Sequence, residues 1–206
     1  MNLVLVTSCV HQYSGYSFYD SETRIKQLIE LTIDSVRKKI PNSYIVILEG
    51  SEVSPEEIKI LKNNSDQLFL HNVKGLDKSS GEVSLIFNFL NSLDFKKIYK
   101  KIDNLIKISG RYYLLENYNF DMYAGCVIKN NKKEWSNEYA SETRYYKVSK
   151  NKIDDYINNL HNLIVNGMHR DIEHSFYFYN VVTPTNTIDK IGIGGLCGVD
   201  GVYVED

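Results

Sequence analysis

The first half of the chain alternates between short apolar runs and stretches whose apolar residues recur at helical spacing. The short runs are typical of β-strands, and the first is continuous enough to predict a strand buried on both faces of a sheet. The four predicted strands cover residues 3–9, 44–48, 67–71 and 104–109.

Helices are predicted between these strands. From about Ser21, apolar residues fall on one helical face until Pro41 ends the helix. Ser54, followed by Pro55 and Glu57, combines an N-cap, a first-turn proline and a capping-box glutamate. Residues 79–82 repeat the capping-box pattern and predict a helix that continues to residue 93.

This alternation of strand and helix predicts an α/β fold with right-handed crossovers and a mainly parallel central sheet flanked by helices. The second half is mixed, with strands expected at residues 125–129 and 144–148 and helices at 150–165 and 172–179. The glycine-rich tail ends in a short strand pattern. Its glycines favour tight turns at the edge of the domain or a loop that closes over a ligand, and they are Gly192, Gly194, Gly195, Gly198 and Gly201. We expect one domain over residues 1–206, with a nucleotide-binding half of about residues 1–115 and an acceptor half of about residues 116–206.

Composition excludes several classes of function. Hydrophobic residues make up 43% of the chain and charged residues 24%, which indicates an ordinary globular domain. The net charge of −2, with both signs mixed along the chain, argues against a nucleic-acid-binding protein. No segment has the pattern of a signal peptide or a membrane span. Cys9, Cys126 and Cys197 lack zinc-site or redox spacing, which favours reduced thiols and a cytoplasmic location.

Polar residues mark the carboxyl ends of the predicted strands, where parallel sheets bind ligands. Thr7 and Ser8 end the first strand, and Glu49 ends the second, where a carboxylate suits hydrogen bonds to a base or ribose. An exposed strand-end glutamate is an equally good interpretation of Glu49. Arg24, near the start of the first helix, either reaches phosphate groups or is a solvated charge.

The fourth strand ends with the most distinctive segment, residues 107–112, which read KISGRY. Strand alternation puts Lys107 and Ser109 on one face. Gly110 allows the backbone to approach a ligand closely, and the planar guanidinium of Arg111 suits a diphosphate. The alternative is a strand that ends in a turn with Lys107 and Arg111 solvated.

A second candidate site opens the last predicted helix with the sequence HRDIEH at residues 169–174. Glu173 and His174 are candidates for a general base. Helix capping explains the same acidic residues equally well, and better in the case of Asp171.

Together these segments resemble glycosyltransferase-like proteins of the GT-A type, which occur in surface-polysaccharide gene sets and in some large viruses. The most specific parts are the Lys-x-Ser-Gly-Arg-Tyr motif and the Arg-x-x-Gln pattern of Arg24 and Gln27. The resemblance covers residues 3–201. It implies a Rossmann-like GT-A architecture in which Thr7, Ser8, Arg24, Glu49, Lys107, Ser109 and Arg111 bind a nucleotide-diphosphate sugar.

The chain departs from this family in one respect. GT-A enzymes usually carry an Asp-any-Asp motif that holds a divalent metal on the diphosphate, and none follows the fourth strand here. Fixed cations such as Lys107 and Arg111 can neutralise the leaving diphosphate instead. The departure therefore favours either metal-independent transfer or a catalytically silent protein.

The resemblance also implies the role of Glu173. In inverting GT-A enzymes a carboxylate in this part of the chain removes the proton of the acceptor hydroxyl, and His174 tunes or replaces it. We therefore expect transfer of a sugar from a nucleotide-diphosphate sugar to a hydroxyl of a glycan or glycolipid. The alternative is a silent nucleotide-sugar or glycan-binding domain. The sequence fits a nucleotidyltransferase less well, because it contains no lysine-bearing phosphate loop and no pair of metal-binding carboxylates.

Overall fold

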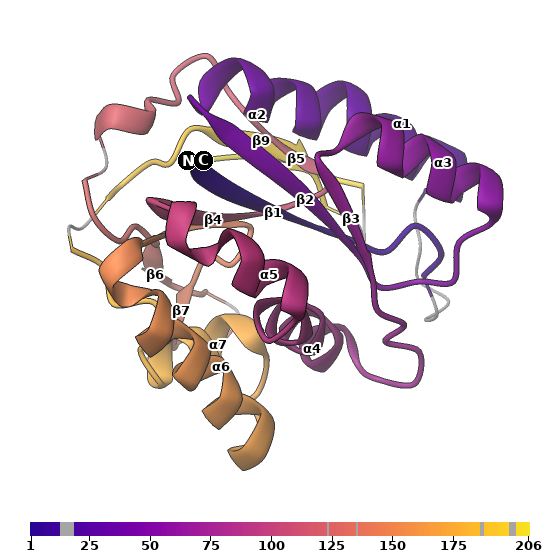
Figure 1. Cartoon of the computed structure of the whole chain (residues 1–206). Helices are drawn as coiled ribbons and strands as arrows, with labels where there is room; N and C mark the ends of the chain where they lie inside the picture. Colours follow the sequence, from indigo (N-terminus) through magenta and orange to yellow (C-terminus); the bar gives the residue numbers. More distant parts are fainter. Residues whose placement is uncertain (13–18, 123, 135, 186–187, 198–200) are drawn as a thin grey trace.

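The computed structural model describes residues 1–12, 19–122, 124–134, 136–185, 188–197 and 201–206. The chain forms a mixed α/β structure around a five-stranded sheet with the order β3-β2-β1-β4-β8 (Figure 1). The first four strands along the chain are parallel, and β8 pairs antiparallel with β4. The strands are β1 (Asn2–Ser8), β2 (Ser43–Glu49), β3 (Gln67–Leu70), β4 (Asn104–Ser109) and β8 (Tyr145–Ser149). All five lie within two residues of the predicted positions, so the mainly parallel α/β sheet is confirmed.

Helices cover both faces of this sheet (Figure 1). One face carries α1 (Ser21–Gln27), the π-helical η1 (Leu28–Ile33), α2 (Asp34–Lys39) and α3 (Pro55–Asn64). The other carries α4 (Lys78–Leu90), α5 (Leu93–Ile98), α6 (Ile153–Asn166) and α7 (Ile172–Phe178). Short 3-10 turns are η2 (Tyr99–Lys101), η3 (Phe120–Met122) and η4 (Lys150–Lys152). No helix of the described ranges is both long and apolar enough to cross a membrane.

The alternation of side chains along β1 divides the core between the two faces. Leu3 and Leu5 pack with the α4 to α7 side, whereas Val4 and Val6 pack with the α1 to α3 side. All four side chains are fully buried. Complete burial of one such side chain contributes about 1.5–3 kcal/mol, which is why a continuous apolar strand is stable only between two layers.

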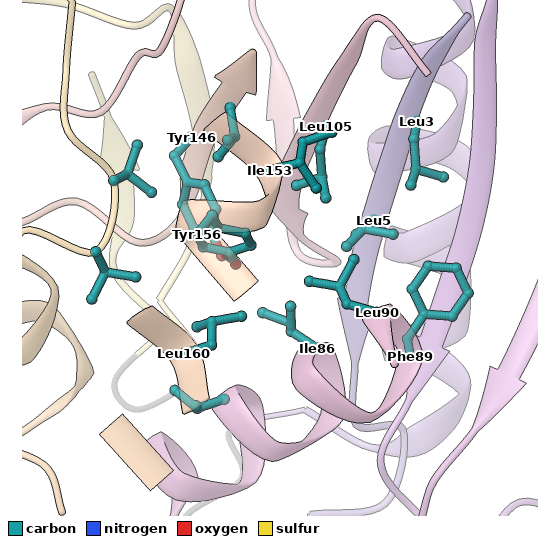
Figure 2. Close-up of a cluster of buried hydrophobic side chains, with 14 of the residues drawn as sticks. Leu3, Leu5, Ile86, Phe89, Leu90, Leu105, Tyr146, Ile153, Tyr156 and Leu160 are labelled. Carbon is teal, nitrogen blue, oxygen red and sulfur yellow. Dashed lines mark hydrogen bonds between the residues drawn. The ribbon is translucent and has the colours of Figure 1, made fainter. Parts of the chain in front are cut away.

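The cluster on the α4 to α7 face contains a pair of tyrosines (Figure 2). Tyr146 of β8 and Tyr156 of α6 are buried, and their hydroxyl oxygens lie 2.5 Å apart. Each ring therefore contributes apolar area while its polar end finds a partner inside the core. This pair joins the antiparallel edge strand to the helix that covers it.

Two capping predictions have different outcomes. Ser54 begins α3 with a complete capping box that includes Glu57, as predicted. The predicted capping box at residues 79–82 is wrong, because Asp77 is the N-cap of α4 and accepts hydrogen bonds from the backbone of Ser79 and Ser80. The predicted helix also breaks before residue 93, where Ser92 caps a new helix, α5.

The second half of the chain contains two small sheets. The strands are β5 (Tyr112–Leu114), β9 (Ile193–Leu196) and β10 (Tyr203–Glu205) in one, and β6 (Asn130–Lys132) and β7 (Tyr139–Ser141) in the other. Residues 125–129 do not form the predicted strand and contribute only an isolated bridge between Val127 and Lys147. Part of the glycine-rich tail is also a strand, since Gly194 and Gly195 pair with β5 and β10. Gly198 lies outside the described residues.

Candidate functional site

A cavity of about 590 Å³ lies at the carboxyl ends of β1, β2 and β4. In the sheet order, β1 lies between β2 and β4, so successive crossovers run in opposite directions from this strand. A parallel sheet forms a ligand crevice at such a switch point. The lining residues are Thr7, Ser8, Cys9, Gln12, Arg24, Gly50, Val73, Gly75, Leu76, Asp77, Lys78, Gly81, Glu82, Leu85, Ser109 and Arg111.

Strand pairing brings the predicted strand ends together. Thr7 pairs with Ser109, and Ser8 pairs with Glu49, so these residues share one edge of the sheet as predicted. Thr7, Ser8 and Ser109 line the cavity, and their hydroxyl groups give this wall both donors and acceptors.

Gly110 has a packing role in addition to the predicted approach of a ligand. A Cβ atom at this position would lie 2.8 Å from Leu28 Cδ1 and 3.1 Å from the carbonyl oxygen of Thr7. Its backbone N–H donates to that same oxygen at 2.8 Å. Gly110 therefore allows the end of β4 to approach β1 and the π-helical segment, rather than serving only the approach of a ligand.

Two arginines form a positively charged side of the cavity. Arg111 follows β4, and its buried Nε atom has no hydrogen-bond partner among the described residues. Arg24 donates from Nη1 to the carbonyl oxygen of Cys9 at 3.0 Å and from Nε to that of Tyr19 at 3.2 Å. Both arginines also line a smaller adjoining cavity of about 40 Å³.

The two guanidinium groups are close enough to repel each other. Burial lowers the pKa of Arg24, and the charge of Arg111 lowers it further. Arginine remains protonated in proteins, so both charges persist. This arrangement supplies two fixed positive charges that an anionic ligand would stabilise.

Lys107 is not a cation of the cavity, which corrects the prediction for this residue. Its side chain is fully buried, does not line the cavity and forms an ion pair with Glu82. It also donates to Ser109 Oγ at 2.7 Å and to the carbonyl oxygen of Thr143 at 2.6 Å. These three partners use all the donors of the ammonium group, so Lys107 is neither solvated nor available to a diphosphate.

Glu82 lines the cavity, whereas the sequence predicted only that it completes a capping box. It lies in the second turn of α4, where its side chain reaches across to Lys107 instead of capping the helix. Burial would raise the pKa of Glu82, but the charge of Lys107 and its hydrogen bond outweigh burial and lower that pKa. Glu82 is therefore an ionised carboxylate in the cavity wall.

Glu49 is also placed differently from the prediction. Its side chain is fully buried and does not line the cavity. Glu49 Oε1 accepts hydrogen bonds from the backbone N–H of Val10 at 3.1 Å, from that of Ser51 at 2.8 Å, and from the Ser51 hydroxyl. The carboxylate thus ties the segment after β1 to the segment after β2, which excludes the exposed interpretation and leaves Glu49 behind the wall of the cavity.

Glu173 lies beside the start of α4, although it is not among the residues that line the cavity. The backbone N–H of Ile172 donates to Ser79 Oγ at 3.2 Å, which joins the first turn of α7 to the first turn of α4. Glu173 Oε1 lies 3.5 Å from the hydroxyl of Thr143, the residue whose carbonyl oxygen Lys107 binds. Burial raises the pKa of Glu173, and the charges of Glu82 and Asp171 add to the increase.

His174 faces away from this cluster. Its side chain is buried, with Nδ1 2.6 Å from Asp171 Oδ1 and Nε2 3.0 Å from Ser136 Oγ. Asp171 also accepts the backbone N–H of His174 and is the N-cap of α7, which confirms its predicted capping role. The structure therefore assigns His174 to holding the start of α7 and separates it from Glu173 as a candidate base.

No group of three or more His, Cys, Asp or Glu side chains within the described ranges is arranged to hold an ion.

No protein-family model matches the chain, and no curated protein matches it.

Proposed function

We propose that this chain is a glycosyltransferase domain that binds a nucleotide-diphosphate sugar in the cavity at the ends of β1 and β4. The observation that carries the proposal is the pair of arginines, Arg24 and Arg111, on one side of a cavity at a switch point of a parallel sheet. A volume of about 590 Å³ is ordinary for a site that encloses a small organic ligand. The GT-A architecture and a single domain over the whole chain are parts of this proposal.

The arginines bind the diphosphate. The buried Nε of Arg111 lacks a partner among the described residues, so a phosphate oxygen would satisfy it. Hydrogen bonds between a guanidinium and a phosphate are charge-assisted and often bidentate. Lys78, which also lines the cavity, adds a third positive charge from the first turn of α4.

These cations assist departure of the nucleotide. In the transfer step, the acceptor oxygen forms a bond to the anomeric carbon while the bond from that carbon to the diphosphate oxygen breaks. The electron pair of the broken bond leaves with the nucleoside diphosphate, where fixed cations stabilise the added charge without a metal. Arg24 and Arg111 take the place that Lys107 and Arg111 were predicted to hold.

Glu173 accepts the proton of the acceptor hydroxyl. Its raised pKa suits a base that must take up a proton. The start of α7 is joined through Ile172 to Ser79 in the first turn of α4, the turn from which Lys78 and Gly81 line the cavity. The acceptor is a hydroxyl-bearing glycan or glycolipid. We place the reaction in the cytoplasm, in keeping with three cysteines that form no disulfide.

A thermal-shift screen of nucleotide sugars, with and without Mn²⁺, tests this proposal. One nucleotide-diphosphate sugar should raise the melting temperature, by an amount that corresponds to about 2.7 kcal/mol at a hundred times its Kd. The increase should be the same without Mn²⁺ and absent with the free sugar. An unchanged melting temperature with every nucleotide sugar would contradict the proposal.

A silent nucleotide-sugar-binding domain is the second candidate. It is favoured by the position of Glu173, which is outside the set of residues that line the cavity. Binding of a nucleotide sugar without transfer to any of a panel of glycan acceptors would select this alternative.

A further inference from the structure

Glu82 and Lys107 form an ion pair that is unusual for its place in the fold. Lys107 lies inside a central strand and is fully buried, while the Glu82 side chain is 16% exposed and lines the cavity. A buried ion pair contributes little to stability, because desolvation of both charges offsets their attraction. A contribution to stability therefore does not account for a lysine inside β4. A function of the Glu82 carboxylate, which faces the cavity, would account for it.

The surroundings of Glu82 fix one of its two oxygens. Oε1 accepts the ammonium group of Lys107 and lies 3.5 Å from the hydroxyl of Thr7. Both contacts involve Oε1, and the structure gives no hydrogen bond to Oε2 within the residues that it describes. One oxygen is thus anchored to the protein, and the other is left for a molecule in the cavity.

The small net charge of the Glu82–Lys107 ion pair limits which chemical group of a ligand would contact Glu82. A carboxylate near Arg111 would weaken the binding of an anion. The ion pair with Lys107 neutralises the charge of Glu82 on the side away from the cavity. The pair therefore offers acceptor oxygens with little net charge, beside the arginines that favour a diphosphate. Neutral donors suit such an oxygen, and hydroxyls are the neutral donors that the sugar rings of a nucleotide sugar supply.

We propose that Glu82, held in place by Lys107, binds hydroxyl groups of a sugar ring attached to the diphosphate. This inference rests on the proposed function and adds to it a residue that recognises the neutral part of the ligand. Lys107 acts as a positioning residue, because it reaches the ligand only through Glu82 and Ser109. The hydroxyls belong either to the ribose of the nucleotide or to the transferred sugar.

Calorimetric titration of three ligands separates these sources. Inorganic pyrophosphate carries no hydroxyl, a nucleoside diphosphate carries only those of ribose, and a nucleotide sugar carries both sets. The test variant is Glu82→Gln combined with Lys107→Met, which removes both charges and leaves no unpaired ion in the core. Glu56→Gln is the matched control, because Glu56 is exposed in α3 and does not line the cavity.

The double variant should bind the nucleotide sugar about tenfold or more weakly than the wild type and bind pyrophosphate equally well. An equal loss with the nucleoside diphosphate assigns the contact to ribose, and a loss confined to the nucleotide sugar assigns it to the transferred sugar. Unchanged nucleotide-sugar affinity, or an equal loss with all three ligands in a variant that melts normally, would overturn the inference. Failure of the wild type to bind any nucleotide sugar would instead overturn the proposed function, and this inference with it.

Discussion

Arg111 and Lys107 lie on two sides of the cavity and differ in whether their charged groups have partners within the protein. On the side formed by the start of α1 and the turn after β4, Arg24 and Arg111 lie close together, and the buried Nε of Arg111 has no hydrogen-bond partner among the described residues. On the side formed by α4 and β4, Lys107 is fully buried against Glu82. Lys107 and Arg111 belong to one short motif, yet Lys107 is paired within the wall, whereas Arg111 keeps a buried donor without a partner among the described residues. The role of each cation is therefore decided by its partners in the fold rather than by its position in the motif.

The largest expected effect is the loss of turnover when Glu173, the proposed general base, is replaced. Replacement of Glu173 with Gln should lower kcat by about 10² to 10⁴, because the amide cannot accept the acceptor's proton. The Kd of the donor, measured by calorimetry, should stay near the wild-type value, since Glu173 acts on the acceptor.

His174→Asn is the control for this experiment. His174 contacts Asp171 and Ser136 rather than the cavity, so its replacement should leave kcat near that of the wild type. Full activity in both variants would return Glu173 to a capping role.

The next effect is a difference in the free energy of unfolding between variants of Lys107 and of Arg111. Lys107→Met leaves the Glu82 carboxylate without its partner and should lower the free energy of unfolding by about 3 kcal/mol. Arg111→Ala should change that free energy by no more than about 0.5 kcal/mol. Urea denaturation of both variants measures the difference.

The combined variant Lys107→Met with Glu82→Gln should recover most of the lost stability, because neither charge is left alone. If Lys107→Met is as stable as Arg111→Ala, the two cations do not differ as the structure indicates.

The smallest effect is a pH dependence. Burial raises the pKa of Glu173 above the ordinary value of 4.5, so kcat should fall as the pH falls through that raised pKa. A carboxyl group whose pKa is raised by folding favours the folded state at low pH and loses this contribution as the pH rises through the folded pKa. The stability of the wild type relative to Glu173→Gln should therefore decrease over the same window. An acid limb of kcat at or below pH 4.5 would count against Glu173 as the base.

The sequence predicted the first half of the fold because its signals are local. The continuous apolar run of β1 and the helix that ends at Pro41 depend on neighbouring residues alone, and both are present in the structure. Of the small sheet, only a short strand at the end of the tail, where β10 lies, was predicted. Its glycine-containing strand β9 was not, since it has weak strand propensity and pairs with distant residues.

The candidate site was predictable in its place but not in its chemistry. Strand ends identified Thr7, Ser109 and Arg111 as neighbours of one cavity, because parallel strands end at the same edge. The burial of Lys107 depends on Glu82, which arrives from α4, and no local pattern indicates that meeting. The same limit applies to His174, whose neighbour Ser136 comes from a distant loop.

Calorimetric titration of a nucleotide-diphosphate sugar into the wild type and Arg111→Ala tests the central claim most directly. Loss of charge-assisted hydrogen bonds should cost about 1.5–3 kcal/mol, a weakening of at least tenfold, without a change in melting temperature. Arg37→Ala is the matched control, because Arg37 lies on α2 outside the cavity and pairs with Asp66. It should bind the ligand as the wild type does. Equal affinity of the wild type and Arg111→Ala would contradict the assignment of the arginine side of the cavity to the diphosphate.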